Sequence, residues 1–360
     1  MALQVNPDIS GLHWITISGT HEEAFRDLGR HMAKEIYSVI KTMPEREPLE
    51  RWSRTEQGER TVARLLATAQ SHYPEELLDL EALADGSGVP FDELFLANIR
   101  GDIGSYDGTG CTDILWKGNH AYSAHNEDGA PAVGRDLTLL TIRIDGEPSI
   151  FTECYPGFLP CNAFTLTESG LAWGINHLPV ASPANAAGRH FVSRALQRCE
   201  TIDEAAAFLK THPMAGGFSF NFASAGERRE INVECAAGKY ASVENERYSW
   251  HTNHLLHMDG ARLDAVGESA VARALGPVDE SLRRGALLED VAPAGQVDAQ
   301  WIWTMLTGAE LPDGVYRTAR GDDPLETLCT TVFDLDACRL HIKGHGSSIE
   351  SFDMYQLQLV

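Results

Sequence analysis

The apolar and polar positions in the first part of the chain predict one short strand followed by helices. Residues 12–18 alternate between apolar and polar side chains, which is typical of a strand with one buried face. Thr20 and Glu23 have the spacing of a capping box, so a helix is expected to begin there and to end before Pro44. Two further helices are predicted at residues 74–84 and 91–100. This part of the chain therefore predicts a helical layer.

Beyond residue 110 the pattern changes to short apolar runs between glycine, proline and asparagine turns. These runs predict strands at residues 120–124, 137–144, 149–154, 171–176, 218–223 and 231–235, and three closing strands at 327–335, 339–343 and 352–359. Helices are expected at residues 202–211 and around 268–307. The predicted order therefore has helices first and then many strands with helices between them. This order favours a layered α+β architecture, built as a single domain over residues 1–360.

The composition and the absence of long apolar runs indicate a cellular location. With 43% hydrophobic residues, the 360-residue chain can bury a substantial core. No apolar run is long enough to cross a bilayer, and the N-terminus lacks the basic-then-apolar order of a secretory signal. We therefore expect a cytoplasmic protein that does not enter a membrane.

The charge balance excludes several classes of partner. The chain has 29 Lys and Arg residues against 52 Asp and Glu residues, a formal net charge of -23. Such a field repels nucleic acid and anionic membrane surfaces, and it disfavours polyanionic substrates such as acyl-coenzyme A. We expect a small molecule as partner, and the oligomeric state stays open.

The seven cysteines form no CxxC pair and no disulfide framework, so buried thiols in a reducing compartment are the ordinary interpretation. Cys111 differs from the others because it directly follows Gly110, where the helical part of the chain gives way to strands. A thiol at this place can attack the preceding carbonyl and move the acyl group from nitrogen to sulfur. Gly108 and Gly110 are expected to permit a tight, strained turn there.

Cleavage of the Gly110–Cys111 bond would give Cys111 a free α-amino group. The pKa of such a group is about 7.7–8.0, so it can act as a base near neutral pH. Nucleophile and base would then belong to one residue, and no catalytic histidine is required.

Two polar segments are candidates to complete the site. The strand ending at residue 124 leads into a polar segment, predicted as a turn, that could return Asp128 toward Cys111 across a hairpin. The amide of Asn253, after a short aromatic strand, could donate to the oxyanion of a tetrahedral intermediate. A solvated hairpin turn and an Asx turn are the alternative interpretations.

His251, His254 and His257 are spaced by three and are a rival constellation for a metal. The residues before them read as a strand, and no carboxylate completes a known helical motif. We therefore expect no metal and no cofactor, and we interpret His251 and His254 as polar residues near the cleft.

Together, Gly110-Cys111-Thr112, the segment 126–128 and the segment 251–254 resemble the acyl-coenzyme A:6-aminopenicillanic acid acyltransferase-like peptidase family of the N-terminal-nucleophile superfamily. The likeness extends over nearly the whole chain in order and length. It implies a four-layer αββα sandwich and autocatalytic cleavage into an α chain (1–110) and a β chain (111–360) that stay associated. It also implies chemistry on an amide or thioester acyl group.

The resemblance also implies roles for individual residues by their position in the motifs. Cys111 matches the nucleophile of the family, and Asn253 matches its oxyanion-hole amide. Asp128 matches an aspartate near the active centre. Many members have an aromatic residue before that aspartate, where this chain has Glu127, so a more acidic substrate pocket is expected. Asn126, Glu127, His251 and His254 are the pocket candidates.

Three functions are compatible with these residues. The first is a self-processed amidohydrolase that cleaves a small N-acyl amide through an acyl-Cys111 thioester and passes the acyl group to water. The second is an N-acyltransferase that passes it to an amine. The third is an uncleaved, noncatalytic binding protein. The acidity and Glu127 favour hydrolysis of a substrate whose amine part is neutral or cationic.

Overall fold

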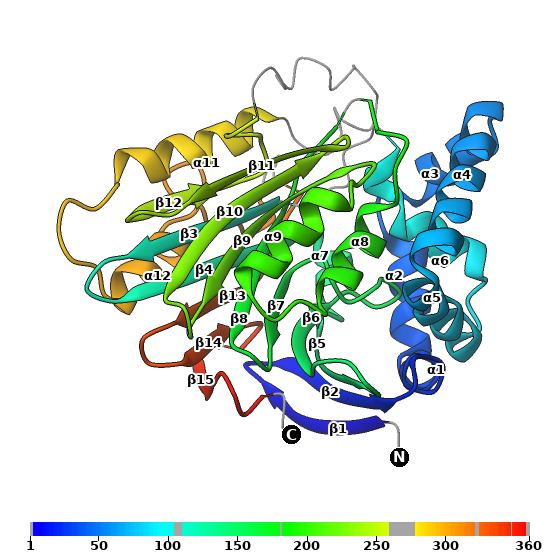
Figure 1. Cartoon of the computed structure of the whole chain (residues 1–360), viewed down its shortest axis with the longest axis horizontal. Helices are drawn as coiled ribbons and strands as arrows, with labels where there is room; N and C mark the ends of the chain where they lie inside the picture. Colours follow the sequence, from blue (N-terminus) through cyan, green and yellow to red (C-terminus); the bar gives the residue numbers. More distant parts are fainter. Residues whose placement is uncertain are drawn as a thin grey trace.

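Two β-sheets packed face to face carry the fold (Figure 1). The computed structural model describes residues 3–103, 110–180, 182–258, 278–320, 324–346 and 348–357. Within these residues, the first sheet has the strand order β1 (Leu3–Ile9), β2 (Leu12–Gly19), β5 (Thr138–Ile144), β6 (Ile150–Cys154), β7 (Phe164–Thr167), β8 (Leu171–His177), β9 (Gly217–Ser224), β10 (Arg229–Ala236) and β11 (Lys239–Glu244). The second has the order β12 (Tyr248–His251), β3 (Gly110–Lys117), β4 (Ala121–Gly129), β13 (Glu326–Asp334), β14 (Arg339–Lys343) and β15 (Glu350–Asp353).

Helices cover the outer face of each sheet. The first sheet is covered by α1 (His21–His31), α8 (Arg189–Leu196) and α9 (Ile202–Thr211). The helices α2 (Ala33–Thr42), α3 (Arg46–Ser53), α4 (Glu56–His72), α5 (Pro74–Ser87) and α6 (Phe91–Asn98) extend this layer, with a 3-10 turn (Arg100–Asp102) and the short α7 (Pro131–Gly134). The second sheet packs against α11 (Val278–Asp290) and α12 (Ala299–Thr307). The predicted four-layer αββα sandwich is therefore confirmed.

The alternation of side chains separates an apolar face of the second sheet from a polar one. Ile114, Trp116 and Ala124 belong to the apolar cluster that includes residues of α12. On the opposite face, Asp113 and His125 lie against Gly174 of β8, between the two sheets. Successive residues of a strand point to opposite faces, so every second residue of β3 and β4 enters this polar layer.

Several predicted boundaries were wrong. The helix expected between Thr20 and Pro44 is two helices, α1 and α2, that meet at Met32. The polar turn expected after residue 124 does not exist, because β4 continues to Gly129 and pairs with β3 and β13. The closing strand expected at 352–359 is β15, which ends at Asp353. The part of the C-terminal helical prediction before residue 278 lies outside the described residues.

A buried ion network joins the helical layer to the first sheet's loops. His21 Nδ1 lies 2.6 Å from Asp79 Oδ1, and its Nε2 lies 3.2 Å from Glu147 Oε1. Arg194 Nε also contacts Asp79, at 3.0 Å. Burial opposes the charge on His21, but hydrogen bonds to the two carboxylates raise its pKa from 6.5 to about 9. The protonated imidazole therefore helps to hold α1 against α5.

The stability contributed by His21 should depend on pH. Because its folded pKa lies above its ordinary value, the contribution is complete below pH 6.5 and is lost as the pH rises through about 9. His21→Gln should thus destabilise the protein by roughly 1 kcal/mol more at pH 6 than at pH 9.5, with partial exposure taken into account. Urea unfolding of both proteins at both pH values measures this, and an equal loss at the two values would contradict it.

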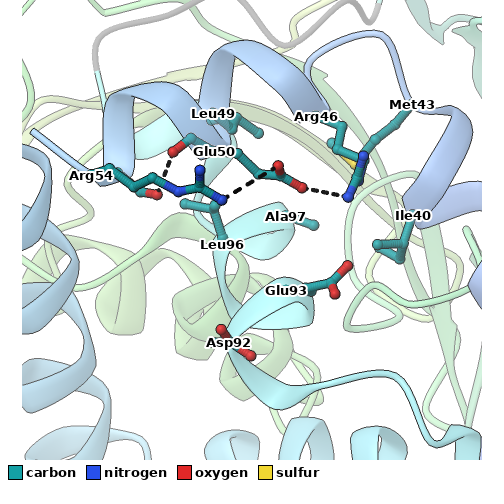
Figure 2. Close-up of a pocket in the computed structure, with 11 residues that line it drawn as sticks. Ile40, Met43, Arg46, Leu49, Glu50, Arg54, Asp92, Glu93, Leu96 and Ala97 are labelled. Carbon is teal, nitrogen blue, oxygen red and sulfur yellow. Dashed lines mark hydrogen bonds and ion pairs between the residues drawn. The ribbon is translucent and has the colours of Figure 1, made fainter.

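A surface hollow lies between α2, α3 and α6, away from the polar layer (Figure 2). Within its lining, Arg46 pairs with Glu50 at 2.6 Å. Its lining residues differ from those of the cavity beside Cys111, and we assign it no function. Among the described helices, none is both long and apolar enough to cross a membrane.

Candidate active site

The pairing of β3 with β4 decides which side chains meet Cys111. Cys111 is directly opposite Glu127, and Gly110 is directly opposite Asp128. Side chains of directly opposed residues in an antiparallel pair lie on the same face. Cys111 and Glu127 therefore share the face toward the first sheet, whereas Asp128 lies on the other face.

Four side chains in the polar layer form a continuous series of hydrogen bonds that ends at the thiol. Cys111 Sγ lies 3.3 Å from Glu127 Oε2, which lies 3.1 Å from His125 Nε2. His125 Nδ1 lies 3.1 Å from Asp113 Oδ2. Tyr155 donates to the other carboxylate oxygen of Glu127 at 2.5 Å. We call Cys111, Glu127, His125 and Asp113 the relay; all four are buried.

The negative surroundings of the relay govern its protonation. Burial, together with the carboxylates of Glu127 and Asp128, raises the pKa of the Cys111 thiol well above its ordinary value. Burial opposes the charge on His125, but attraction to Asp113 and hydrogen bonds to both relay carboxylates raise its pKa well above the ordinary value. At neutral pH the relay therefore holds a protonated thiol and an imidazolium between two carboxyl groups.

Asn253 lies beside the nucleophile, as expected, but with its oxygen toward Cys111. The Cys111 nitrogen donates to Asn253 Oδ1 at 2.9 Å, and Arg284 Nη2 donates to the same oxygen at 2.7 Å. The amide nitrogen Nδ2 donates to the His177 carbonyl at 3.1 Å. Its second hydrogen has no acceptor among the described residues. Ser281 fixes the segment by accepting from the Asn253 backbone at 2.7 Å.

Two arginines surround the Gly110–Cys111 bond. Arg284 Nη1 donates to the Cys111 carbonyl at 2.6 Å. A Cβ atom on Gly110 would lie 2.4 Å from Arg317 Nη1, so a larger residue there would require the Arg317 guanidinium to move. Gly110 itself lies in a strand, because it begins β3, and the rest of the expected turn falls on residues outside the described ranges. Gly108 also lies outside the described residues.

Asp128 faces the two arginines. Its Oδ1 accepts from Thr327 at 2.7 Å. Burial raises its pKa to about 7, although the positive charges of Arg317 and Arg284 act in the opposite direction. Asp128 is thus close to the backbone of the candidate scissile bond, on the face opposite the thiol.

Three other candidates lie outside the cavity beside Cys111. Asn126 points toward α12, where it donates to the Leu306 carbonyl at 2.8 Å. His251 Nε2 lies 3.0 Å from Glu234 Oε1. His254 Nδ1 lies 2.9 Å from Ser281 Oγ, so it supports the Asn253 segment.

A small cavity opens beside Cys111 and Glu127. Side chains from five other parts of the chain complete its lining: Arg100, Asn162, His177, Arg189, His190 and Phe218. The guanidinium of Arg189 lies 4.3 Å from the centre of the Phe218 ring. The lining of the cavity therefore combines a thiol, a carboxylate, two guanidinium groups and an aromatic wall.

Two groups of side chains bring three ligand-type atoms within 4.8 Å of one another: Cys111, His125 and Glu127, and His21, Glu75 and Glu147. Hydrogen bonds and ion pairs within the described residues already explain both groups, so we assign a metal to neither. Neither group includes His251, His254 or His257, the triplet considered from the sequence.

Gly174 makes room for the relay from the opposite sheet. A Cβ atom on Gly174 would lie 2.1 Å from Asp113 Oδ1 and 2.8 Å from His125 Nδ1. Sequence reasoning missed Asp113, His125 and Gly174. The signal was present in the alternation, because Asp113 is two residues after Cys111 and His125 is two residues before Glu127.

Gly174→Ala should destabilise the protein by about 1–3 kcal/mol, because the added methyl group overlaps two buried polar side chains. Urea unfolding measures the loss. Gly226→Ala is the matched control, since nothing lies within 4 Å of its Cβ position. Equal effects of the two substitutions would contradict the packing described for Gly174.

Comparison with known proteins adds three findings. The model of the family acyl-coenzyme A:6-aminopenicillanic acid acyl-transferase matches residues 116–347, more than half of the chain. Because the match begins after Cys111, the assignment of the nucleophile depends on the geometry above.

The chain is also 23% identical over 366 residues to a β-alanyl-dopamine/carcinine hydrolase from Drosophila melanogaster, with 92% of each chain covered. Among solved structures, a mutant conjugated bile acid hydrolase from Clostridium perfringens matches with a TM-score of 0.42 and 11% identity. That match covers 69% of this chain and 94% of the bile acid hydrolase chain.

Proposed function

Because this chain belongs to the acyl-coenzyme A:6-aminopenicillanic acid acyl-transferase family, we propose that it is a self-processed cysteine amidohydrolase whose nucleophile is Cys111. The observation that carries this proposal is the position of Cys111. Its thiol lines the cavity, while its own nitrogen is held by Asn253 at 2.9 Å.

The first reaction is cleavage of the chain itself. The thiol of Cys111 attacks the Gly110 carbonyl, and water hydrolyses the resulting thioester. The products are an α chain of residues 1–110 and a β chain of residues 111–360. The parallel pairing of β2 with β5, and the ion pair of Asp79 on α5 with Arg194 on α8, join the two fragments and support their continued association.

In the processed enzyme, the α-amino group of Cys111 serves as the base. It removes the thiol proton, and the thiolate attacks the substrate amide. The protonated α-amino group then returns this proton to the leaving nitrogen, so the amine departs as the acyl-Cys111 thioester forms. Asn253 is suited to two tasks here. Its oxygen orients the Cys111 nitrogen, and the second hydrogen on Nδ2 can donate to the oxyanion.

The proposed substrate is a small N-acyl amide. The Drosophila relative is named for the hydrolysis of β-alanyl-dopamine and carcinine, which favours amide hydrolysis and makes these two compounds the first probes. Glu127 gives one side of the cavity an acceptor for a polar or cationic group. The family name supports the alternative, transfer of the acyl group to an amine. A noncatalytic protein would keep an intact chain and an inert thiol.

Cys111→Ala should abolish both chain cleavage and substrate turnover, because one sulfur atom is the nucleophile in each reaction. Intact-mass analysis and product assays measure the two effects separately. Cys235→Ala is the matched control, since this buried thiol lies on β10 and outside the cavity. Normal cleavage of the Cys111→Ala chain would exclude the proposed nucleophile.

The acyl acceptor is predicted to be water. The net charge of -23 disfavours a phosphorylated carrier at the site. Processed enzyme should therefore release free acid from β-alanyl-dopamine, carcinine or another N-acyl amine without coenzyme A. A parallel assay supplies acyl-coenzyme A and amines, with Cys111→Ala enzyme as control. Transfer from the thioester alone, with no amide hydrolysis, would favour the acyltransferase.

A further inference from the structure

The uncut chain needs a base that the processed enzyme does not need. After cleavage, the α-amino group of Cys111 can take the thiol proton. Before cleavage the same nitrogen is a peptide amide, which donates its hydrogen to Asn253 Oδ1 at 2.9 Å and cannot serve as a base. Another group must therefore accept the thiol proton while the chain processes itself.

Glu127 is placed to be that acceptor. Its Oε2 lies 3.3 Å from Cys111 Sγ, within hydrogen-bond distance for sulfur, and both side chains line the same cavity. Among the described residues, Glu127 is the side chain to which the thiol hydrogen-bonds. The contact follows from the register of β3 and β4, which sets the two residues directly opposite each other.

We propose that Glu127 is the catalytic base of self-processing, an inference that rests on the proposed function of Cys111. Glu127 Oε2 takes the proton from Sγ as sulfur bonds to the carbonyl carbon of Gly110. The Gly110–Cys111 C–N bond then breaks, the Cys111 nitrogen takes up the proton, and Gly110 becomes a thioester on Sγ. Water hydrolyses this thioester, which restores the thiol and leaves a carboxylate on Gly110.

The charges around Cys111 favour transfer of the thiol proton to Glu127 during the attack on the Gly110 carbonyl, not before it. Burial and the Glu127 and Asp128 carboxylates raise the pKa of the thiol, so a thiolate formed in advance is rare. With Glu127 as base, one negative charge moves from the carboxylate to the attacked carbonyl, and no additional charge is buried. Arg317, next to Gly110, and Arg284, on the Cys111 carbonyl, provide positive charge at this bond.

The rest of the network positions Glu127. His125 holds Oε2 and is itself held by Asp113, while Tyr155 holds Oε1. These three are positioning residues, because none of them contacts the sulfur in the described hydrogen bonds. Their bonds fix both carboxylate oxygens, so Oε2 cannot turn away from the thiol without breaking two contacts.

Glu127→Gln tests the proposal, because the amide keeps the size of the side chain and cannot take the proton. Its precursor should be cleaved about 10²–10⁴-fold more slowly than the wild-type chain, the usual contribution of a general base. Glu127→Asp, which keeps a carboxylate but shortens the side chain, should be intermediate. Intact-mass analysis at timed intervals after purification measures the fraction cleaved, and thermal unfolding checks that each precursor is folded.

Glu153→Gln is the matched control. Glu153 is a buried carboxyl group on β6 whose pKa is raised well above its ordinary value by burial and by the nearby Glu127. Burial thus favours its neutral form, which an amide resembles closely, and its substitution should leave cleavage at the wild-type rate. This control separates the loss of the base from the effect of changing a buried acid.

The outcomes distinguish the two proposals. A folded Glu127→Gln precursor that stays intact, beside cleaved wild-type and Glu153→Gln chains, supports Glu127 as the base. Cleavage of Glu127→Gln at the wild-type rate overturns this inference and leaves the proposed function standing. A wild-type chain that never cleaves overturns the proposed self-processing itself.

Discussion

The register between β3 and β4 is the constraint on which the rest of the site depends. It sets Cys111 opposite Glu127 and Gly110 opposite Asp128. A shift of β3 by one residue would turn the thiol away from Glu127 and toward the apolar cluster under α12. The hydrogen bonds between β3 and β4 thus place the thiol next to the relay and the cavity. They also place the backbone of the scissile bond next to Arg284 and Arg317.

Burying the relay between two sheets has an energetic cost that the surrounding structure offsets. Isolated charges in such a layer would be strongly destabilising, but each relay carboxylate accepts a hydrogen bond from an imidazole. Gly174 on the facing strand leaves the space that this network occupies. The same low-dielectric surroundings keep the thiol protonated until a base acts on it, which makes the cysteine selective in what it attacks.

The sequence predicted the layers of the fold and the residues near Cys111 better than it predicted which face of the sheet each polar side chain occupies. The capping residue Thr20 and the apolar runs of the central strands gave correct elements, because local chemistry determines them. The segment around Asn126 and Asp128 looked like a turn because it is polar. Its polar groups are instead satisfied by partners far away in sequence, such as Thr330 and Thr327, which local patterns do not reveal. The roles of Arg284 and Gly174 are likewise long-range.

The central claim is that the chain creates its own N-terminal nucleophile by cleaving the Gly110–Cys111 bond. Amino-terminal sequencing of the larger fragment from freshly purified protein tests this most directly. The account predicts a sequence that begins Cys-Thr-Asp-Ile, at Cys111. A larger fragment that begins at any other residue, or a single uncut polypeptide, would contradict it.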